Sequence, residues 1–404
     1  MTSTTGDPTA ATLDWLTTKP GMKWHRHGAD VLAAWVADMD FAPAAAITER
    51  LGEVLAAGDL GYRDWFPPGG SPLRALFAER MSERYRWAID PGRNRELCDV
   101  VQGIEAALHV STAPGDGVVL HTPAYPPFFA SLAHMGRRVV DVPAQRTADG
   151  WGFDHEALAT QLEADPTIRA LLLCNPHNPT GHVFRVDELV ELAALAERHD
   201  LLVISDEIHA DLVHDPHRHQ PIAALDDDIA ARTVTVSSAS KAFNLAGLRW
   251  AVMHLGHRPT LDALDGLPGH LLGAPNLMGV EATIAAWTDG AEWLDAIRRQ
   301  LDRNRRRVVE RLAALPGVDV SLPEATYLAW IDTTGLALGA EPYDIVRRAG
   351  VELSPGPSFG AQGAGFVRLN FATSAEVLEV VLDRVTGALS GAGDPPEQRV
   401  MPRR

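Results

Sequence analysis

Short apolar runs alternate with amphipathic stretches through the middle of the chain. Four runs have the length of buried strands, at Val118 to His121, Ala170 to Cys174, Leu201 to Ser205 and Thr233 to Ser237. Between two of them, residues Val186 to His199 repeat apolar positions at helical spacing. Strands that alternate with helices pair in parallel through crossover connections. The pattern therefore predicts an α/β fold with a mostly parallel sheet flanked by helices.

The alternating pattern stops near residue 290. A long Arg-rich helix is predicted from Trp293 to Leu315, and apolar runs at Tyr327 to Ile331 and Phe366 to Asn370 predict further strands. We therefore expect a smaller α+β domain after the large one. The segment from Val31 to Ala37 has the pattern of an extended arm, which we expect to pack with this second domain.

The chain thus divides into four predicted parts. These are an N-terminal arm over residues 1–45, a large domain over 46–290, a small C-terminal domain over 291–390 and a tail over 391–404. A length of 404 residues suits more than one packing unit. Both ends, Met1 to Pro8 and Gly391 to Arg404, are rich in Pro, Gly and polar residues, so we expect them to be disordered.

Composition narrows the classes of function. The formal charge of −17 argues against a nucleic-acid binder, which needs a basic face. No apolar run approaches the roughly 18 residues that span a bilayer, and the first residues lack the pattern of a secretory signal. The two cysteines, Cys98 and Cys174, lie far apart in sequence and form no CxxC pair. We therefore expect no disulfide framework and a location in the reducing cytoplasm.

Sixteen histidines raise the question of a metal site. The densest groups contain His25, His27, His214, His217 and His219, all in polar segments without the HExxH spacing of a helical zinc site. We expect these side chains to be solvated at the surface, and we predict no bound metal.

A lysine follows a cluster of hydroxyls at the end of a predicted strand. Ser238 and Ser240 precede Lys241, and Arg249 lies eight positions later. Hydroxyls and an arginine can hold a dianionic phosphate, while a lysine amine can attack an aldehyde once burial or nearby cations lower its pKa. Taken alone, these residues have a second interpretation, as the ordinary end of a strand.

Two more predicted strands carry polar residues at their carboxyl ends, where open α/β sheets bind ligands. Asn178 lies in the Pro-rich turn Asn175 to Gly181 and can donate a hydrogen bond to a ring oxygen, although a plain turn has the same composition. Asp206 can keep a pyridine nitrogen protonated, and His209 can reach the hydroxyl side of the same ring. Glu207 is expected to be a structural or solvated neighbour.

A helix is predicted to open at Gln102, after a short strand over Asp99 to Val101. Gly103, Ile104 and Glu105 would then lie at the helix start, where backbone amides and the helix dipole favour a phosphate.

Two further residues have alternative interpretations. Tyr125 lies in a Pro-stiffened loop and suits either stacking on a flat ring or packing. Arg368 is alone in an apolar strand and suits either a substrate carboxylate or a buried salt bridge.

Taken in order, these motifs resemble the fold-type I pyridoxal phosphate (PLP) enzymes of the class I/II aminotransferase superfamily. The resemblance rests on Asn178, Asp206, Ser238, Lys241, Arg249 and Arg368, and it spans roughly residues 20–385. The runs Trp35 to Phe41, Asn175 to Gly181, Ser205 to His209, Thr326 to Trp330 and Gly365 to Asn370 are similar to the MalY/PatB branch, which contains cystathionine β-lyases and other C–S lyases.

The resemblance implies a role for each motif residue. Lys241 would hold PLP as a Schiff base, Asp206 would pair with the pyridine nitrogen, and Tyr125 would stack on the ring. Asn178 and His209 would face the ring hydroxyl. Those implied at the phosphate are Ser238, Ser240, Arg249, the helix start at Gly103, the amides of Ile104 and Glu105, and Tyr62 from a second subunit. Arg368, helped by backbone near Val36 and Ala37, would bind the substrate α-carboxylate.

The resemblance implies β-elimination from a small β-thio amino acid, giving pyruvate, ammonia and a thiol, in a homodimer with a shared active site. An aminotransferase is the nearest alternative. A PLP-binding regulator is a second, although the sequence shows no winged-helix pattern before residue 20 and no pattern of a basic reading helix. Two residues depart from the branch pattern, since Glu105 puts an acid near the predicted phosphate site and Ala34 stands where a proline is usual.

Overall fold

The computed structural model describes residues 7–28, 30–64, 70–148, 150–268 and 270–392. Most of the two segments expected to be disordered, residues 1–6 and 393–404, therefore lies outside the described residues. The expectation is wrong for Gly391 and Ala392, because both belong to the last helix, α14 (Ala375–Ala392). No helix in the described ranges is long and apolar enough to cross a membrane.

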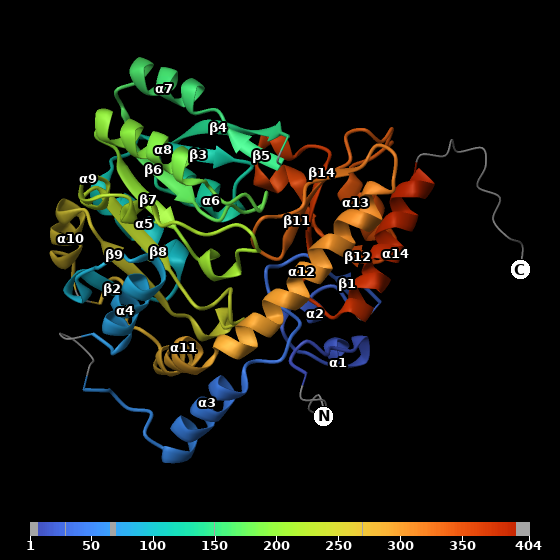
Figure 1. Ribbon diagram of the computed structural model, residues 1–404, viewed down its shortest axis with the longest axis horizontal. Helices are drawn as coiled ribbons and strands as arrows, with labels where there is room; N and C mark the ends of the chain where they lie inside the picture. Colours follow the sequence, from blue (N-terminus) through green and yellow to red (C-terminus); the bar gives the residue numbers. More distant parts are fainter. Residues whose placement is uncertain (1–6, 29, 65–69, 149, 269, 393–404) are drawn as a thin grey trace, which may run out of the picture.

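An eight-stranded sheet forms the larger part of the molecule (Figure 1). Its order is β2-β9-β8-β7-β6-β3-β4-β5, with β4, β3, β6, β7 and β8 parallel and β5, β9 and β2 in antiparallel pairs. The strands are β2 (Asn94–Leu97), β3 (Gly117–Thr122), β4 (Arg138–Thr147), β5 (Gly150–Phe153), β6 (Ile168–Cys174), β7 (Leu202–Asp206), β8 (Thr233–Ser237) and β9 (Ala251–Leu255). The four strands predicted from the apolar runs are confirmed to within two residues at their ends.

Helices cover both faces of this sheet because its central strands are apolar on both sides. Those of this part are α4 (Leu73–Tyr85), α5 (Val100–Ser111), α6 (Pro126–His134), α7 (His155–Ala164), α8 (Val186–Arg198), α9 (Asp227–Ala230), α10 (Arg258–Asp265) and α11 (Leu277–Asp289). Alternate residues of a strand belong to different cores. Leu172 packs in the cluster with α5 and α10, and Leu171 and Leu173 pack in the cluster with α7 and α8.

A smaller sheet with the order β10-β11-β14-β13 lies beside the large one, and all its pairings are antiparallel. This part contains α12 (Ala291–Ala313), β10 (Asp319–Val320), β11 (Leu328–Asp332), α13 (Pro342–Arg348), β12 (Val351–Glu352), β13 (Ser354–Pro355), β14 (Phe366–Asn370) and α14. The predicted Arg-rich helix and both predicted late strands are confirmed as α12, β11 and β14. Helix α12 runs diagonally past the smaller sheet, from beside α11 toward α13 and α14 (Figure 1).

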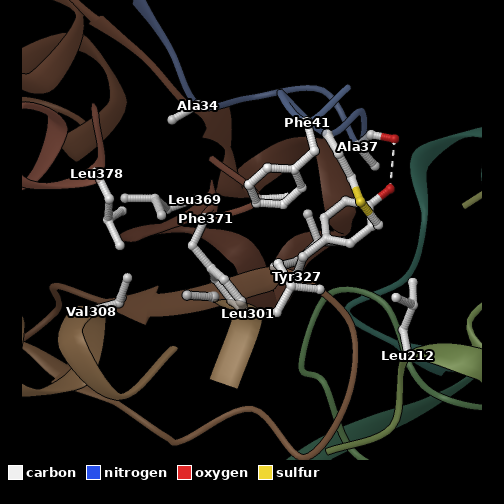
Figure 2. Close-up of a cluster of buried hydrophobic side chains, with 14 of the residues drawn as sticks. Ala34, Ala37, Phe41, Leu212, Leu301, Val308, Tyr327, Leu369, Phe371 and Leu378 are labelled. Atoms are coloured by element: carbon white, nitrogen blue, oxygen red, sulfur yellow. Dashed lines mark hydrogen bonds between the residues drawn. The ribbon is translucent and has the colours of Figure 1, made fainter. Parts of the chain in front are cut away.

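The N-terminal segment packs mainly against the smaller part of the molecule, except for its last helix, which packs against α11 of the larger part. It contains α1 (Leu13–Thr17), α2 (Met22–His25), β1 (Leu32–Ala33) and α3 (Ala45–Ala57). Strand β1 pairs in parallel with β12, in the register Leu32 to Val351. Figure 2 shows Ala34, Ala37 and Phe41 of this arm beside Tyr327, Leu369 and Phe371, in a core that α12 and α14 complete.

Leu301→Ala tests how far this shared core supports the fold. Leu301 of α12 is fully buried in the cluster, so truncation should lower the free energy of unfolding by about 2–5 kcal/mol through lost burial and a cavity. Val380→Ala on the exposed side of α14 is the control, with an expected change within about 0.5 kcal/mol. Urea unfolding of both variants makes the measurement. Equal effects would contradict the assignment of Leu301 to a tightly packed core.

Candidate active site

One cavity opens where β6, β7 and β8 end. Its lining residues come from the arm, from the start of α5 and from the loops after the strands: Ala37, Cys98, Asp99, Val100, Val101, Tyr125, Cys174, Asn178, Asp206, Ile208, His209, Ser240, Lys241, Ala246, Arg249 and Trp250. Eight of them were predicted as site residues from the sequence, namely Ala37, Tyr125, Asn178, Asp206, His209, Ser240, Lys241 and Arg249. Parallel strands gather their carboxyl ends at one edge, which explains why residues so far apart in sequence meet here.

Lys241 extends into this cavity from the turn after β8. Its Nζ donates a hydrogen bond to the backbone oxygen of Ala37 at 2.9 Å. Burial lowers the pKa of the Lys241 amine and Arg368 lowers it further, while Asp38 and Asp206 oppose the shift. The surroundings therefore shift the amine toward its neutral form, which is the nucleophilic one.

Asp206, the last residue of β7, is buried with no cationic side chain in a salt bridge to it among the described residues. Burial raises the pKa of its carboxyl to about 7, with Glu207 adding to the shift, while the hydrogen bond from the Ile208 amide at 3.0 Å and the Lys241 amine oppose it. A buried acid of this kind fits a ligand that brings its own cationic N–H.

His209 supplies an uncharged polar group to the same wall. Burial lowers the pKa of its ring to about 3, helped by Lys241 and Arg368, so the ring is neutral at physiological pH. Its Nδ1 is buried without a hydrogen-bond partner in the described structure. The cavity wall thus contains a His209 nitrogen without a hydrogen-bond partner and an Asp206 carboxyl without a salt bridge among the described residues. Both features indicate a cavity that binds a polar ligand.

Arg368 reaches Asn178 from the smaller sheet. Its Nη1 donates to the Asn178 Oδ1 at 3.0 Å, and its Nη2 donates to the Trp35 oxygen at 2.9 Å and to the Ser354 Oγ at 3.0 Å. Its Nε has no hydrogen-bond partner among the described residues, and burial lowers the pKa of the guanidinium to about 10. No carboxylate pairs with it in the described ranges, so the buried salt bridge considered from the sequence is not formed there. An anionic ligand group is the natural partner.

The helix whose start was predicted to bind a phosphate begins at a different residue from the one predicted. Strand β2 ends at Leu97, and Asp99 is the N-cap of α5, its side chain accepting the Gln102 amide at 2.7 Å. The predicted strand over residues 99–101 does not exist, and the first amides of the helix belong to Val100 and Val101. The signal was present in the sequence, since an Asp followed three residues later by a Gln is a capping pattern.

Gly103, Ile104 and Glu105 consequently lie inside α5 and do not line the cavity. Gly103 is needed for packing, since a Cβ there would lie 2.6 Å from the Val236 Cγ1 of the sheet. The Glu105 carboxylate accepts a hydrogen bond from the Ser131 Oγ at 2.6 Å, and Ser131 belongs to α6. The acid at this end of the cavity is Asp99, which forms an ion pair with Arg249.

Of four other predicted site residues, three lie off the cavity wall and one lies on it. Ser238 is not on the cavity wall, and its Oγ donates to the Trp250 oxygen at 2.7 Å and accepts from the Ser240 amide, which shapes the turn that holds Lys241. Val36 binds the Asn370 side chain through its backbone oxygen, and Ala37 alone of the pair lines the cavity. Tyr62 follows α3, is 88% exposed and does not line the cavity of its own chain.

Two of the five histidines expected at the surface are buried instead. His219 lies 3.0 Å from the Glu207 Oε2 through its Nε2, and His214 lies 2.8 Å from the Thr326 oxygen. A specific acceptor faces one ring nitrogen of each, although the buried Nδ1 of His219 has no hydrogen-bond partner among the described residues, and Glu207 is the structural partner of His219. Among the described residues, no three His, Cys, Asp or Glu side chains form a group that can hold a metal ion.

The cavity therefore combines a lysine with a lowered pKa, a buried acid, an aromatic ring and Arg249, and Arg368 adjoins it through Asn178. Comparison with known proteins gives the class. The family model for aminotransferase class I and II matches residues 72–385, and the chain belongs to this family.

Among curated relatives, the cystathionine β-lyase PatB of Bacillus subtilis is 35% identical, covering 91% of this chain and 96% of that protein. The protein MalY of Escherichia coli is 35% identical, covering 87% and 90%. Among solved structures, OvoB has a TM-score of 0.87 at 35% identity, covering 92% of this chain and 96% of that one. Cystalysin from Treponema denticola, which contains pyridoxal 5'-phosphate, has a TM-score of 0.85 at 28% identity with the same coverage.

Asp206→Asn should flatten the pH dependence of stability in the protein without ligand. The folded-state pKa of about 7 lies above the ordinary value of 3.8. Between these values the folded protein keeps a proton that the unfolded chain releases, so the free energy of unfolding falls as pH rises from about 4 to about 7, by up to roughly 1.4 kcal/mol per pH unit. Urea unfolding across this range measures the slope. Parallel curves for the two proteins would contradict a raised pKa at Asp206.

Proposed function

We propose that the protein is a PLP-dependent C–S β-lyase, which cleaves a β-thio amino acid to pyruvate, ammonia and a thiol. The observation that carries the proposal is the meeting of the Lys241 amine and the buried Asp206 carboxyl in one cavity. The relatives support it, because PatB is a cystathionine β-lyase and cystalysin contains the cofactor.

The residues of the cavity fit PLP group by group. Asp206 would pair with the ring nitrogen, Asn178 and His209 would face the ring hydroxyl, and Tyr125 would lie against the ring. At the phosphate, we propose Ser240, Arg249 and the amides of Val100 and Val101, which replace those of Ile104 and Glu105 in the assignment. Bound PLP supplies an aldehyde that bonds to Lys241 and a ring that accepts the electron pair released at the substrate Cα.

The chain's own residues would then divide the work on the substrate. Arg368 would bind the α-carboxylate through its unpartnered Nε, since its two Nη atoms are already fixed by Asn178 and Trp35. Once the substrate amine has replaced Lys241 on the aldehyde, the freed lysine amine, whose pKa is lowered, would remove the proton from Cα as a general base, which contributes roughly 10²–10⁴ to a rate. Cleavage of the Cβ–S bond then releases a thiolate that carries the bonding pair away.

Lys241→Ala tests the covalent attachment. Purified wild-type protein mixed with PLP should show an imine absorption band, and borohydride should fix the cofactor on Lys241, as peptide mass spectrometry can verify. The variant should show neither, and pyruvate formation from a β-thio amino acid should be abolished, because both the attachment and the base are lost. Wild-type-like pyruvate production by the variant would refute the assignment.

An aminotransferase remains the second candidate, because relatives of the same family include the aspartate aminotransferase of Pyrococcus abyssi, 29% identical over 89% of this chain. A panel of β-thio amino acids separates the two functions. A lyase should release pyruvate and free thiol in equal amounts without a keto acid. An enzyme that forms a new amino acid only when a keto acid is added would favour the aminotransferase. A PLP-binding regulator would show neither activity.

The same proposal includes a homodimer in the cytoplasm. Tyr62 supports a shared active site, since it is exposed on its own chain and suits the phosphate end of a partner's cavity. The proposal also keeps the division of the chain into an arm over residues 1–45, a large domain over 46–290 and a small domain over 291–390. The two unpaired cysteines support the reducing environment.

A further inference from the structure

A carboxylate occupies the end of the cavity assigned to the phosphate. Asp99 lines the wall beside Arg249, Val100 and Val101. One of its oxygens accepts the Gln102 amide at the start of α5, and the other forms the ion pair with Arg249. Asp99 therefore holds both kinds of group that a phosphate would use, the arginine and the helix N-terminus.

We propose that Asp99 competes with the phosphate of the cofactor, so that this chain binds PLP more weakly than the rest of its site allows. The inference rests on the proposed function. A phosphate that enters the site must share Arg249 with a carboxylate and lie beside a charge of its own sign, which costs free energy. Solvent weakens the repulsion without removing it, since the side chains of Asp99 and Arg249 are 32% and 54% exposed.

The negative charge of Asp99 is not needed to cap α5. Asn and Ser cap helices about as well as Asp does, because capping requires only a side-chain oxygen that accepts the N2 or N3 amide. Asp99→Asn thus keeps the acceptor for Gln102 and removes the charge that opposes phosphate. Glu105, the acid suspected from the sequence, is bound to Ser131 and is not part of this competition.

The test compares two ligands that differ only in the phosphate. Protein freed of cofactor is titrated with PLP and with pyridoxal, and the imine band gives both dissociation constants. Asp99→Asn should tighten PLP binding by about tenfold, a size expected for one partly screened charge pair, and should leave pyridoxal unchanged. Asp154→Asn is the matched control, since Asp154 caps α7 away from the cavity and should alter neither constant.

Three outcomes would overturn the inference: unchanged PLP affinity, weaker PLP affinity, or equal tightening of both ligands. Weaker binding would mean that Asp99 orders Arg249 for the phosphate. Asp99→Ser, which also keeps a capping oxygen, must behave as Asp99→Asn does. Inorganic phosphate gives a readout that needs no imine, because it should raise the melting temperature of Asp99→Asn more than that of the wild type. If the wild type forms no imine, the proposed function fails, while the phosphate measurement still decides the inference about Asp99.

Discussion

The backbone oxygen of Ala37 is the point where the three parts of the molecule meet. It accepts hydrogen bonds from the Lys241 Nζ and from the Tyr327 hydroxyl, both at 2.9 Å, and Figure 2 shows the second of these. Lys241 lies in the turn after β8 of the large sheet, Tyr327 precedes a strand of the small one, and Ala37 belongs to the arm. The position of the amine in the cavity therefore depends on the packing of all three.

The apolar core around Ala37 explains how so many charged groups can remain buried nearby. Arg368 and Asp206 are both buried without an oppositely charged partner in a salt bridge among the described residues, and each arrangement costs free energy. Phe41, Leu369 and Phe371 pack close to the site and contribute burial that offsets the cost. The burial of the core thus offsets the cost of keeping Arg368 and Asp206 without salt-bridge partners, an arrangement that suits a ligand rather than the empty protein.

How much could be predicted from the sequence depended on the range of the interaction. The strands of the large sheet followed from local apolar periodicity, and residues at their carboxyl ends, such as Asp206 and Lys241, met in the cavity because parallel strands share an edge. The start of α5 was misplaced because the cap at Asp99 was taken for a strand residue. His214 and His219 were misjudged for another reason. Their acceptors, the Thr326 oxygen and Glu207, are brought to them only by the tertiary fold.

The arm contacts both side chains that the proposed reaction needs on the substrate, Arg368 for the carboxylate and Lys241 for the proton. Trp35 accepts a hydrogen bond from Arg368, and Ala37, two residues further, accepts one from Lys241. Asn370, two residues beyond Arg368 on β14, donates to the Val36 oxygen between them at 2.6 Å. A shift of residues 35–37 would move the acceptors of the guanidinium and of the amine together. One short backbone segment therefore helps to position both the residue that would hold the substrate carboxylate and the residue that would take the proton from the substrate Cα.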